Sequence, residues 1–299
     1  MKEKTEEKIG KVLENRQINF LYRTYLLFSE HKMKVYSGYA ALYILMAMIP
    51  LLMLIIFFIN RFSPIGVDTF IDTLTGFMGD LPEVQDMIRE TVYNLNAQSS
   101  GLVASLSALT TLWSASNGVS AIQLGLDELH DTGITTMRGK PKALIYTIVF
   151  IVSMPAIMVL QLMKNPLISL VTGILEYLNL SGAARAFASV MQYSYIMSFV
   201  LFVLLVLLVY TYLPGGKHSL RSQFPGALLA CVGTIIFSTA FGFFMGTFWK
   251  ASAFYGSLAA IFLSAMWLRY EMAIIFFGAS FNEVLYRDTQ SGEGEDLHD

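Results

Sequence analysis

Long apolar stretches separated by short polar segments dominate this chain. Six of them are long enough to cross a bilayer, because a spanning helix needs about 20 apolar residues. These stretches are Val35–Ile59, Ser99–Leu126, Ala143–Met163, Tyr193–Leu213, Phe224–Phe248 and Tyr255–Leu285. The first five contain no charged residue. The pattern predicts an all-α integral membrane protein with six transmembrane helices.

The basic residues are divided unevenly between the two sides of such a membrane domain. The side that holds the N-terminus carries fourteen of the twenty Lys and Arg residues, the opposite side carries five, and Arg269 lies inside the last stretch. Cytoplasmic loops carry the excess of Lys and Arg in membrane proteins. Both termini are therefore expected to be cytoplasmic. The start of the chain is polar and does not resemble a secretory signal peptide, so we expect a multi-pass protein of a bacterial inner (plasma) membrane.

Three regions follow from this topology. Residues 1–34 form a cytoplasmic N-terminal segment, residues 35–286 the six-helix transmembrane domain, and residues 287–299 an acidic tail that we expect to be disordered. Within the first region, apolar residues recur at helical spacing and predict an amphipathic helix in the cytoplasmic interface. They are Ile18, Leu21, Tyr22, Tyr25 and Phe28. The alternative is a simple helical extension of the first span.

Composition excludes several classes of function. Hydrophobic residues make up 55% of the chain and charged residues only 14%, whereas a soluble domain carries about 25% charged residues. The net charge of −2 and the lack of a Lys/Arg cluster argue against nucleic acid as a partner. No phosphate-binding loop or paired zinc motif occurs, so we expect neither an enzyme, nor an intrinsic ATPase, nor a metal or cofactor.

The four histidines are scattered along the sequence. They are His31, His130, His218 and His298. His130 lies in the acidic segment 127–131, which is best interpreted as the solvated end of a helix. Metal-dependent nucleases need clustered ligands, and the sequence shows none.

Two charges, Arg269 and Glu271, interrupt the middle of the last apolar stretch. A charge inside the hydrocarbon region is costly and usually faces a protein interior or a water-filled cavity. Ser264, Glu271 and Asn282 fall on one helical face. Together with Arg269 and Glu283 they predict a polar substrate pathway inside the helix bundle. Two structural alternatives stay open: Arg269 can extend toward the headgroups, and Glu271 can form a buried hydrogen bond to a neighbouring helix.

Small residues recur on one face of the second stretch. They are Gly101, Ala104, Ala108, Thr111, Ala115, Gly118 and Gly125. Such a face lets helices approach closely within lipid, so packing is the default interpretation and a transport pathway the alternative. Ser114, Ser116 and Asn117 are the polar residues of this segment that we expect to form the wall opposite Glu271.

Three motifs together resemble the YihY/BrkB family of membrane proteins, once misleadingly named ribonuclease BN. They are the small-residue and Tyr run Ser37–Tyr43 before Pro50-Leu-Leu52, the segment Leu112-Trp-Ser-Ala-Ser-Asn-Gly-Val119, and the series Leu213-Pro214, Arg221, Pro225-Gly-Ala227, Tyr255–Leu258, Trp267-Leu268, Gly278-Ala279 and Asn282. The family commonly has an acidic residue directly after Gly-Ala, where this chain has Ser280. Glu283 lies three residues later on nearly the same helix face and is a candidate substitute.

The resemblance implies a protein that moves a lipid or lipid-like anion across the inner membrane. Together with the polar stripe and the small-residue face, it predicts a transporter or flippase for a lipid or amphipathic anion, with membrane lipids as partners. A homo-oligomer is compatible with these features. The alternative is a membrane scaffold or accessory protein of cell-envelope assembly.

The predicted topology can be tested with cysteines placed at Ser63 and at Ser291. An impermeant thiol reagent applied to intact cells should label position 63, which we place outside, and leave position 291 unlabelled. Labelling of position 291 with none at position 63 would invert the topology.

Overall fold

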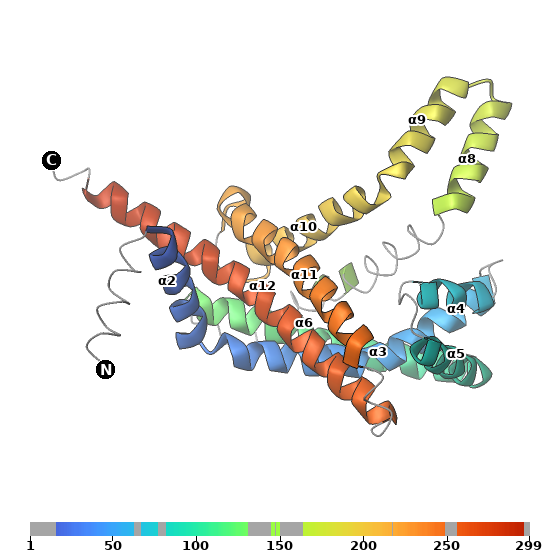
Figure 1. Cartoon of the computed structure of the whole chain (residues 1–299), viewed down its shortest axis with the longest axis horizontal. Helices are drawn as coiled ribbons and strands as arrows, with labels where there is room; N and C mark the ends of the chain where they lie inside the picture. Colours follow the sequence, from blue (N-terminus) through green and yellow to red (C-terminus); the bar gives the residue numbers. More distant parts are fainter. Residues whose placement is uncertain are drawn as a thin grey trace. The chain divides into compact units, whose positions relative to one another are not determined.

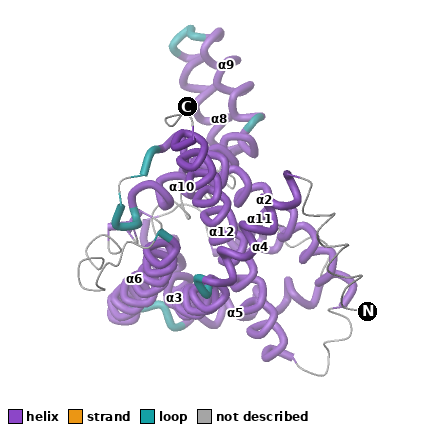
Figure 2. Tube along the Cα trace, turned by 90° about the vertical axis from the view of Figure 1, so that its left-hand side faces the viewer, coloured by secondary structure: helices purple, strands orange, loops and turns teal. Residues whose placement is uncertain are grey.

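In the computed structural model, every regular element of the described residues is a helix (Figures 1 and 2). The described residues are 16–62, 67–76, 82–130, 145–146, 148–149, 164–216, 218–248 and 256–295.

Three of the described helices are long and apolar enough to cross a membrane. They are α3 (Met33–Phe62), α11 (Leu220–Phe248) and α12 (Gly256–Glu295), and α10 (Ser194–Tyr212) contains a shorter apolar segment. The second predicted span lies in α6 (Gly101–Leu129). The third, Ala143–Met163, falls almost entirely outside the described residues. The all-helical membrane protein is thus confirmed, whereas the six spans and the orientation of the termini stay predictions.

The chain divides into two compact units, and each is described by itself. Unit 1 comprises Met1–Leu45, Ser116–Leu144 and Val203–Asp299, and unit 2 comprises Met46–Ala115 and Ile145–Phe202. Helices α11 and α12 therefore lie wholly in unit 1, as does α2 (Arg16–Glu30). Among the helices wholly in unit 2 are α4 (Val67–Gly76), α5 (Pro82–Ala97), α8 (Lys164–Tyr177) and α9 (Ser181–Gln192).

In unit 2, the end of α3 packs on α4 and α5 through an apolar cluster. Its buried members are Ile56, Val67, Phe70, Ile71 and Val92. On the exposed side of the same helices, the Tyr93 hydroxyl donates to Asp68 at 2.5 Å and Arg89 donates to Asp72 at 3.1 Å. The Asp68 carboxylate raises the pKa of Tyr93 through this hydrogen bond. The apolar cluster and the two polar contacts together join α4 to α5.

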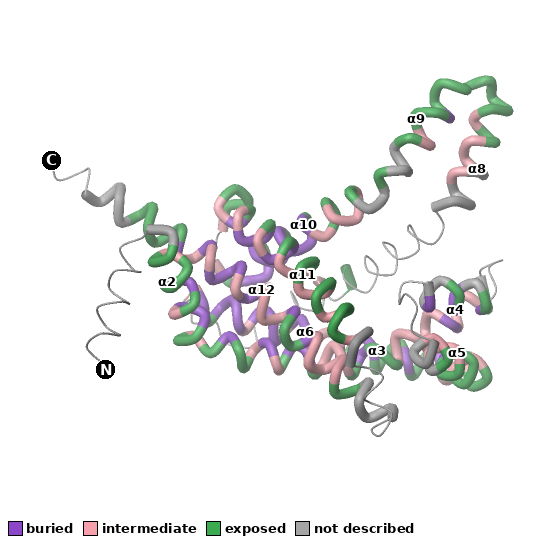
Figure 3. The backbone as a smooth tube through the Cα atoms, viewed as in Figure 1, coloured by how far each residue is buried: buried purple, intermediate pink, exposed green. Residues whose placement is uncertain are grey.

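In unit 1, the backbones of α11 and α12 come into close contact. A Cβ added at Gly278 would lie 2.5 Å from the carbonyl oxygen of Gly226 and 2.8 Å from Cβ of Ala230. A Cβ added at Gly226 would collide with the carbonyl oxygen of Gly278. Only glycine fits at these two positions. Most of the buried residues of unit 1 come from this pair of helices, from α2, and from the parts of α3, α6 and α10 that belong to the unit (Figure 3).

Helix α2 is separate from α3 and does not extend it. The chain turns at Lys32, whose φ of 56° is the left-handed conformation that commonly ends a helix. The amide of Lys32 donates to the carbonyl of Ser29 and that of Val35 donates to the carbonyl of Lys32. This break favours the predicted amphipathic helix over a longer first span.

One face of α2 packs on α12 and another is exposed. Phe20 meets Phe281 edge to face with ring centroids 4.9 Å apart, and Phe28 meets Phe277 at 6.1 Å. The predicted apolar stripe lies elsewhere, with the exception of the buried Phe28, because Ile18, Leu21, Tyr22 and Tyr25 are exposed. An exposed apolar stripe beside membrane-spanning helices is the surface expected of an interfacial helix.

Helix α12 extends further than the sequence analysis indicates. We expected residues 287–299 to be disordered, but α12 continues to Glu295. Arg287 donates to Glu283 one turn earlier at 2.8 Å, and Arg23 of α2 contacts Asp288 at 2.7 Å. Side-chain pairs four residues apart stabilise a helix, and these contacts account for its continuation.

The interfacial position of α2 can be tested with the double substitution Leu21→Asp and Tyr25→Asp. Both side chains are about half exposed, so the change removes little packing inside the protein but places charge in the membrane interface. The melting temperature in lipid nanodiscs should fall by about 2–4 °C for each kcal/mol of interfacial binding lost. Ser29→Asp, at the exposed polar end of α2, is the control and should change little. Equal stability of the double variant and wild type would place α2 in solvent.

Candidate functional site

The polar stripe predicted on α12 faces α11. Glu271 is 5% exposed, and the Ser238 hydroxyl of α11 donates to its Oε1 at 2.5 Å. The hydroxyl of Thr234 and the indole of Trp267 also lie beside this carboxyl group. Oε2 of Glu271 and Oγ1 of Thr234 are buried without a hydrogen-bond partner among the described residues. A buried polar group without a partner is costly, so this seam between α11 and α12 is the candidate site.

The structure separates the two charges of α12. Arg269 is exposed, whereas Glu271 is buried against α11. The two positions are about 200° apart around a helix with 3.6 residues per turn, which explains the difference. Ser264, two turns before Glu271, is half-buried. We therefore assign Glu271 to the helix seam and Arg269 to the outer face of α12.

Asn282 joins α12 to the first turns of α11. Its Oδ1 accepts a hydrogen bond from the amide of Gly226 at 2.6 Å, and its Nδ2 donates to both the backbone oxygen and Oε1 of Gln223 at 2.9 Å. The neighbouring Pro225 lacks an N–H and disturbs the helical hydrogen bonds of this turn. Asn282 satisfies the backbone groups around the proline, so its contacts are structural.

The candidate residues of α6 are placed differently from one another. Ser114 is buried and belongs to unit 2, whereas Ser116 and Asn117 are half-buried and belong to unit 1. On the same helix, a Cβ at Gly125 would lie 2.5 Å from the Phe276 ring of α12, and one at Gly118 would lie 3.3 Å from Ile44. These two small residues provide space for neighbouring side chains, as the packing interpretation expects.

Glu283 belongs to a cluster that the sequence did not reveal. His130 directly follows α6 and His218 precedes α11, and their ring centroids are 4.2 Å apart. Nε2 of His130 lies 3.7 Å from Oε2 of Glu283, and Arg287 donates to the other carboxylate oxygen at 2.8 Å. We call His130, His218 and Glu283 the histidine cluster. The two histidines are 88 positions apart, so no spacing signal could have identified the pair.

The described residues contain no set of three side chains arranged to hold a metal ion. The neighbours of the histidine cluster change how readily His218 binds a proton. Burial lowers the pKa of His218, and the neighbouring His130 lowers it further, while the Glu283 carboxylate acts in the opposite direction. Asp127, one turn before His130, accepts a hydrogen bond from the amide of Gly215 at 2.7 Å. It thereby fixes the connection that carries His218.

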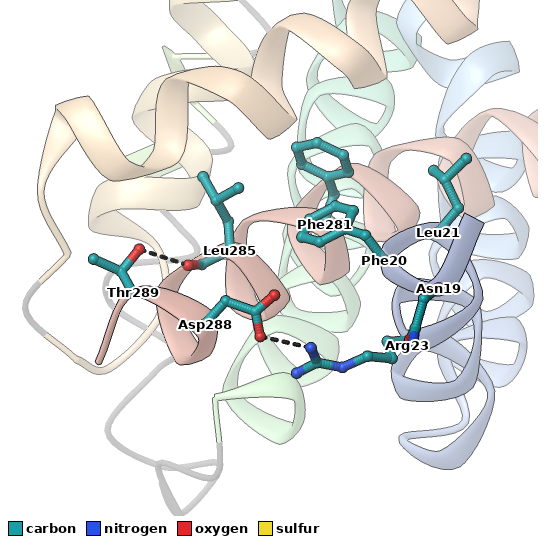
Figure 4. A pocket seen from close by; sticks show the side chains of 8 residues that line it. All are labelled: Asn19, Phe20, Leu21, Arg23, Phe281, Leu285, Asp288 and Thr289. Carbon is teal, nitrogen blue, oxygen red and sulfur yellow. Dashed lines mark hydrogen bonds and ion pairs between the residues drawn. The ribbon is translucent and has the colours of Figure 1, made fainter. Parts of the chain in front are cut away.

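A groove of about 900 Å³ lies between α2 and α12. Figure 4 shows Phe20 and Phe281 in its wall and the Arg23–Asp288 ion pair across it. The two charged side chains are 48% and 40% exposed, and exposed pairs of this kind contribute little stability. The groove is an amphipathic surface at one end of unit 1, with apolar walls and an accessible pair of opposite charges.

Comparison with protein families gives a match over nearly the whole chain. The family model described as virulence factor BrkB matches residues 24–298. The chain belongs to the BrkB family. This confirms the resemblance seen in the sequence motifs and makes the protein a member of a family of membrane proteins.

Two relatives of this BrkB-family protein match most of its length. It is 24% identical over 275 residues to the "Putative ribonuclease-like protein YfkH" of Bacillus subtilis (strain 168), covering 90% of this chain and 96% of that protein. It is 23% identical to a "UPF0761 membrane protein" of Actinobacillus pleuropneumoniae serotype 5b (strain L20), covering 88% and 92%.

A shorter match relates it to a "UPF0761 membrane protein" of Xanthomonas campestris pv. campestris (strain 8004). This match is 33% identical over 75 residues, which is 25% of this chain and 18% of that protein. No solved structure matches the chain.

The structural role of Asn282 predicts that Asn282→Ala destabilises the protein. The change removes three buried hydrogen bonds and leaves the Gly226 amide unpaired, a loss of about 2–4 kcal/mol in the free energy of unfolding. Asn96→Ala removes a solvent-facing amide pair with Asn60 and should cost less than about 0.5 kcal/mol. Denaturant unfolding in detergent compares the two. An Asn282→Ala protein as stable as wild type would show that Asn282 is not an anchor.

Proposed function

We propose that this BrkB-family membrane protein moves a lipid or an amphipathic anion across the bacterial inner membrane without an ATPase of its own. The supporting observation is Glu271, a buried carboxyl group in the middle of an apolar span that is only partly satisfied by Ser238. Ionisable residues inside membrane helices are costly and are typical of substrate or ion pathways.

The seam between α11 and α12 is the proposed polar step of the pathway. Ser238 and Thr234 supply hydroxyl groups from α11, and Glu271 supplies a carboxyl group from α12. These groups form a short polar segment in otherwise apolar sequence. A polar headgroup passing along it would exchange hydration for these side chains, while its acyl chains remain in lipid.

Arg269 has a different role in the proposal. Its guanidinium is exposed on the outer face of α12, where it is accessible to an anionic group. Arginine can bind phosphate or carboxylate with two parallel hydrogen bonds, which lysine cannot. We propose that Arg269 attracts the anionic group and that Glu271 acts at the following polar step.

A membrane scaffold of cell-envelope assembly is the second candidate function. The observation that favours it is the turn between α8 and α9, where Tyr177 is 87% exposed and Leu178 and Leu180 are also exposed. Exposed apolar side chains gathered at one place are typical of binding surfaces. A scaffold would need this turn but would not need the charge of Glu271.

The transport proposal predicts that Glu271→Gln lowers the rate of lipid scrambling in proteoliposomes by about 10-fold or more, while folding is retained. The amide preserves the shape and the hydrogen bond with Ser238 but removes the charge. Glu176→Gln, on the exposed turn of α8, is the matched control and should scramble like wild type. A tenfold change in rate corresponds to about 1.4 kcal/mol in activation free energy.

Arg269 supplies a second arm of the same assay. If two parallel hydrogen bonds to the anion matter, the Arg269→Lys variant should scramble lipid as slowly as the Arg269→Ala variant. If only positive charge matters, the Arg269→Lys variant should scramble lipid at the wild-type rate. Absence of scrambling by the wild-type protein, together with loss of envelope-protein cross-links in a Tyr177→Ala variant, would support the scaffold. Unchanged transport after both charges are removed would refute the proposed pathway.

A further inference from the structure

The histidine cluster brings together three parts of unit 1 that are far apart in sequence. His130 ends α6, His218 lies in the connection between α10 and α11, and Glu283 belongs to α12. The His130 side chain is 4% exposed and that of Glu283 is 12% exposed. Nε2 of each histidine is buried without a hydrogen-bond partner among the described residues. These two imidazole nitrogens lie beside a carboxylate, and each can bind a proton.

The backbone fixes where a proton binds on His130. Its Nδ1 lies 2.6 Å from the carbonyl oxygen of Leu126, and since a carbonyl only accepts, Nδ1 carries the hydrogen. In the neutral ring, Nε2 then presents its lone pair, 3.7 Å from the Glu283 carboxylate. Two acceptors facing each other repel, whereas a proton on Nε2 converts the contact into an ion pair. A charge on His130 therefore joins the end of α6 to Glu283 of α12 through an ion pair.

A second proton has the opposite effect. His218 is 4.2 Å from His130 between ring centroids, so protonation of both places two positive charges in contact in a buried site. The single carboxylate of Glu283 is already shared with Arg287. Asp127 is engaged by the amide of Gly215. Glu283, which is shared with Arg287, is thus the carboxylate that favours a charge on His218, and it is opposed by burial and by His130.

We propose that the histidine cluster is a proton-controlled contact: the rings of His130 and His218 stay together while His218 is neutral, and a proton on His218 releases the connection between α10 and α11. The proposal goes beyond the proposed transport function and does not depend on it. The end of α6 and the connection that carries His218 are expected to separate as the pH falls.

The direction of the response follows from the environment of His218. Its pKa in the closed contact is below the ordinary histidine value of about 6.5 because of burial and of His130. A released connection exposes His218 to water and restores that ordinary value. The released form therefore binds more protons, so the contact is closed above about pH 6.5 and is lost progressively at lower pH.

Hydrogen exchange of the full-length protein in nanodiscs can measure this release. Peptides that cover residues 126–130 and 213–220 should lose protection as the pH falls from 7.5 to 5, after correction for intrinsic exchange. The expected loss is up to tenfold for each pH unit while one proton is taken up, beginning below pH 6.5. The same protein with ¹³C-labelled histidine gives the titration midpoint of His218 by NMR.

Three variants separate the proposal from a general acid effect. His218→Gln should abolish the pH-dependent loss of protection. His130→Gln should raise the titration midpoint of His218 because it removes the positive neighbour. His31→Gln is the matched control, since Nδ1 of His31 also contacts a carbonyl one turn earlier, that of Leu27, at 3.0 Å; it should keep the wild-type response.

A milder variant covers the case in which the histidine variants fail to fold. A Cβ at Gly216 would lie 2.7 Å from Nε2 of His218, so Gly216→Ala should displace the imidazole without removing a titratable group and should bring its midpoint closer to 6.5. The proposal is overturned if His218 titrates at its ordinary value in the wild-type protein, or if protection falls at a pH unrelated to that titration.

Discussion

The close contact of α11 with α12 at Gly226 and Gly278 is the constraint on which the described part of unit 1 depends. In lipid, helices gain little from the hydrophobic effect between them, so association depends on packing and on interhelical hydrogen bonds. Both are present here within one turn of helix. The glycines allow the backbones to touch, and Asn282 bonds to the Gly226 amide and to Gln223 beside Pro225. The proline would otherwise leave backbone polar groups unsatisfied in a buried position, which a membrane helix tolerates only when a neighbour compensates.

That contact also determines the environment of Glu271. The residue lies two turns before Gly278 on the same face, so a backbone approach at Gly278 brings the Glu271 side chain against α11, where Ser238 meets it. Gly233, between these two levels, accommodates Ile274, whose Cγ2 would lie 2.9 Å from an added Cβ. The seam is therefore tight on the side of Glu271 that leads to Gly278. A carboxyl group in such a position cannot easily gain water, and this is the physical reason to assign it a role in moving a polar group or a proton.

The sequence predicted the elements better than their contacts. Apolar length identified α3, α11 and α12, and the stripe from Ile18 to Phe28 identified α2, because these signals are local. The positions of Ser264, Glu271 and Asn282 identified a single polar face of α12. The sequence could not say whether that face meets a helix or a cavity, since the answer depends on residues of α11 that lie 33 to 59 positions earlier in the chain. His130 and His218 show the limit most clearly, because they are isolated in sequence and adjacent only after α6 and the α10–α11 connection meet.

The position of the α11–α12 contact limits which part of unit 1 can respond to protonation of the histidine cluster. Glu283 lies twelve residues after Glu271, about 18 Å along α12, and Gly278 and Asn282 hold the helix between them. Tyr210 near the end of α10 donates a hydrogen bond to the carbonyl oxygen of Ile275, which holds α10 to α12 as well. With α10, α11 and α12 joined in this way, a repulsion between His130 and His218 cannot readily move the helices. It acts on residues 213–216, which follow α10 without regular structure and are held to α6 by the hydrogen bond from the Gly215 amide to Asp127. The cluster can therefore respond to pH at one end of unit 1 while the seam at Glu271 keeps its geometry.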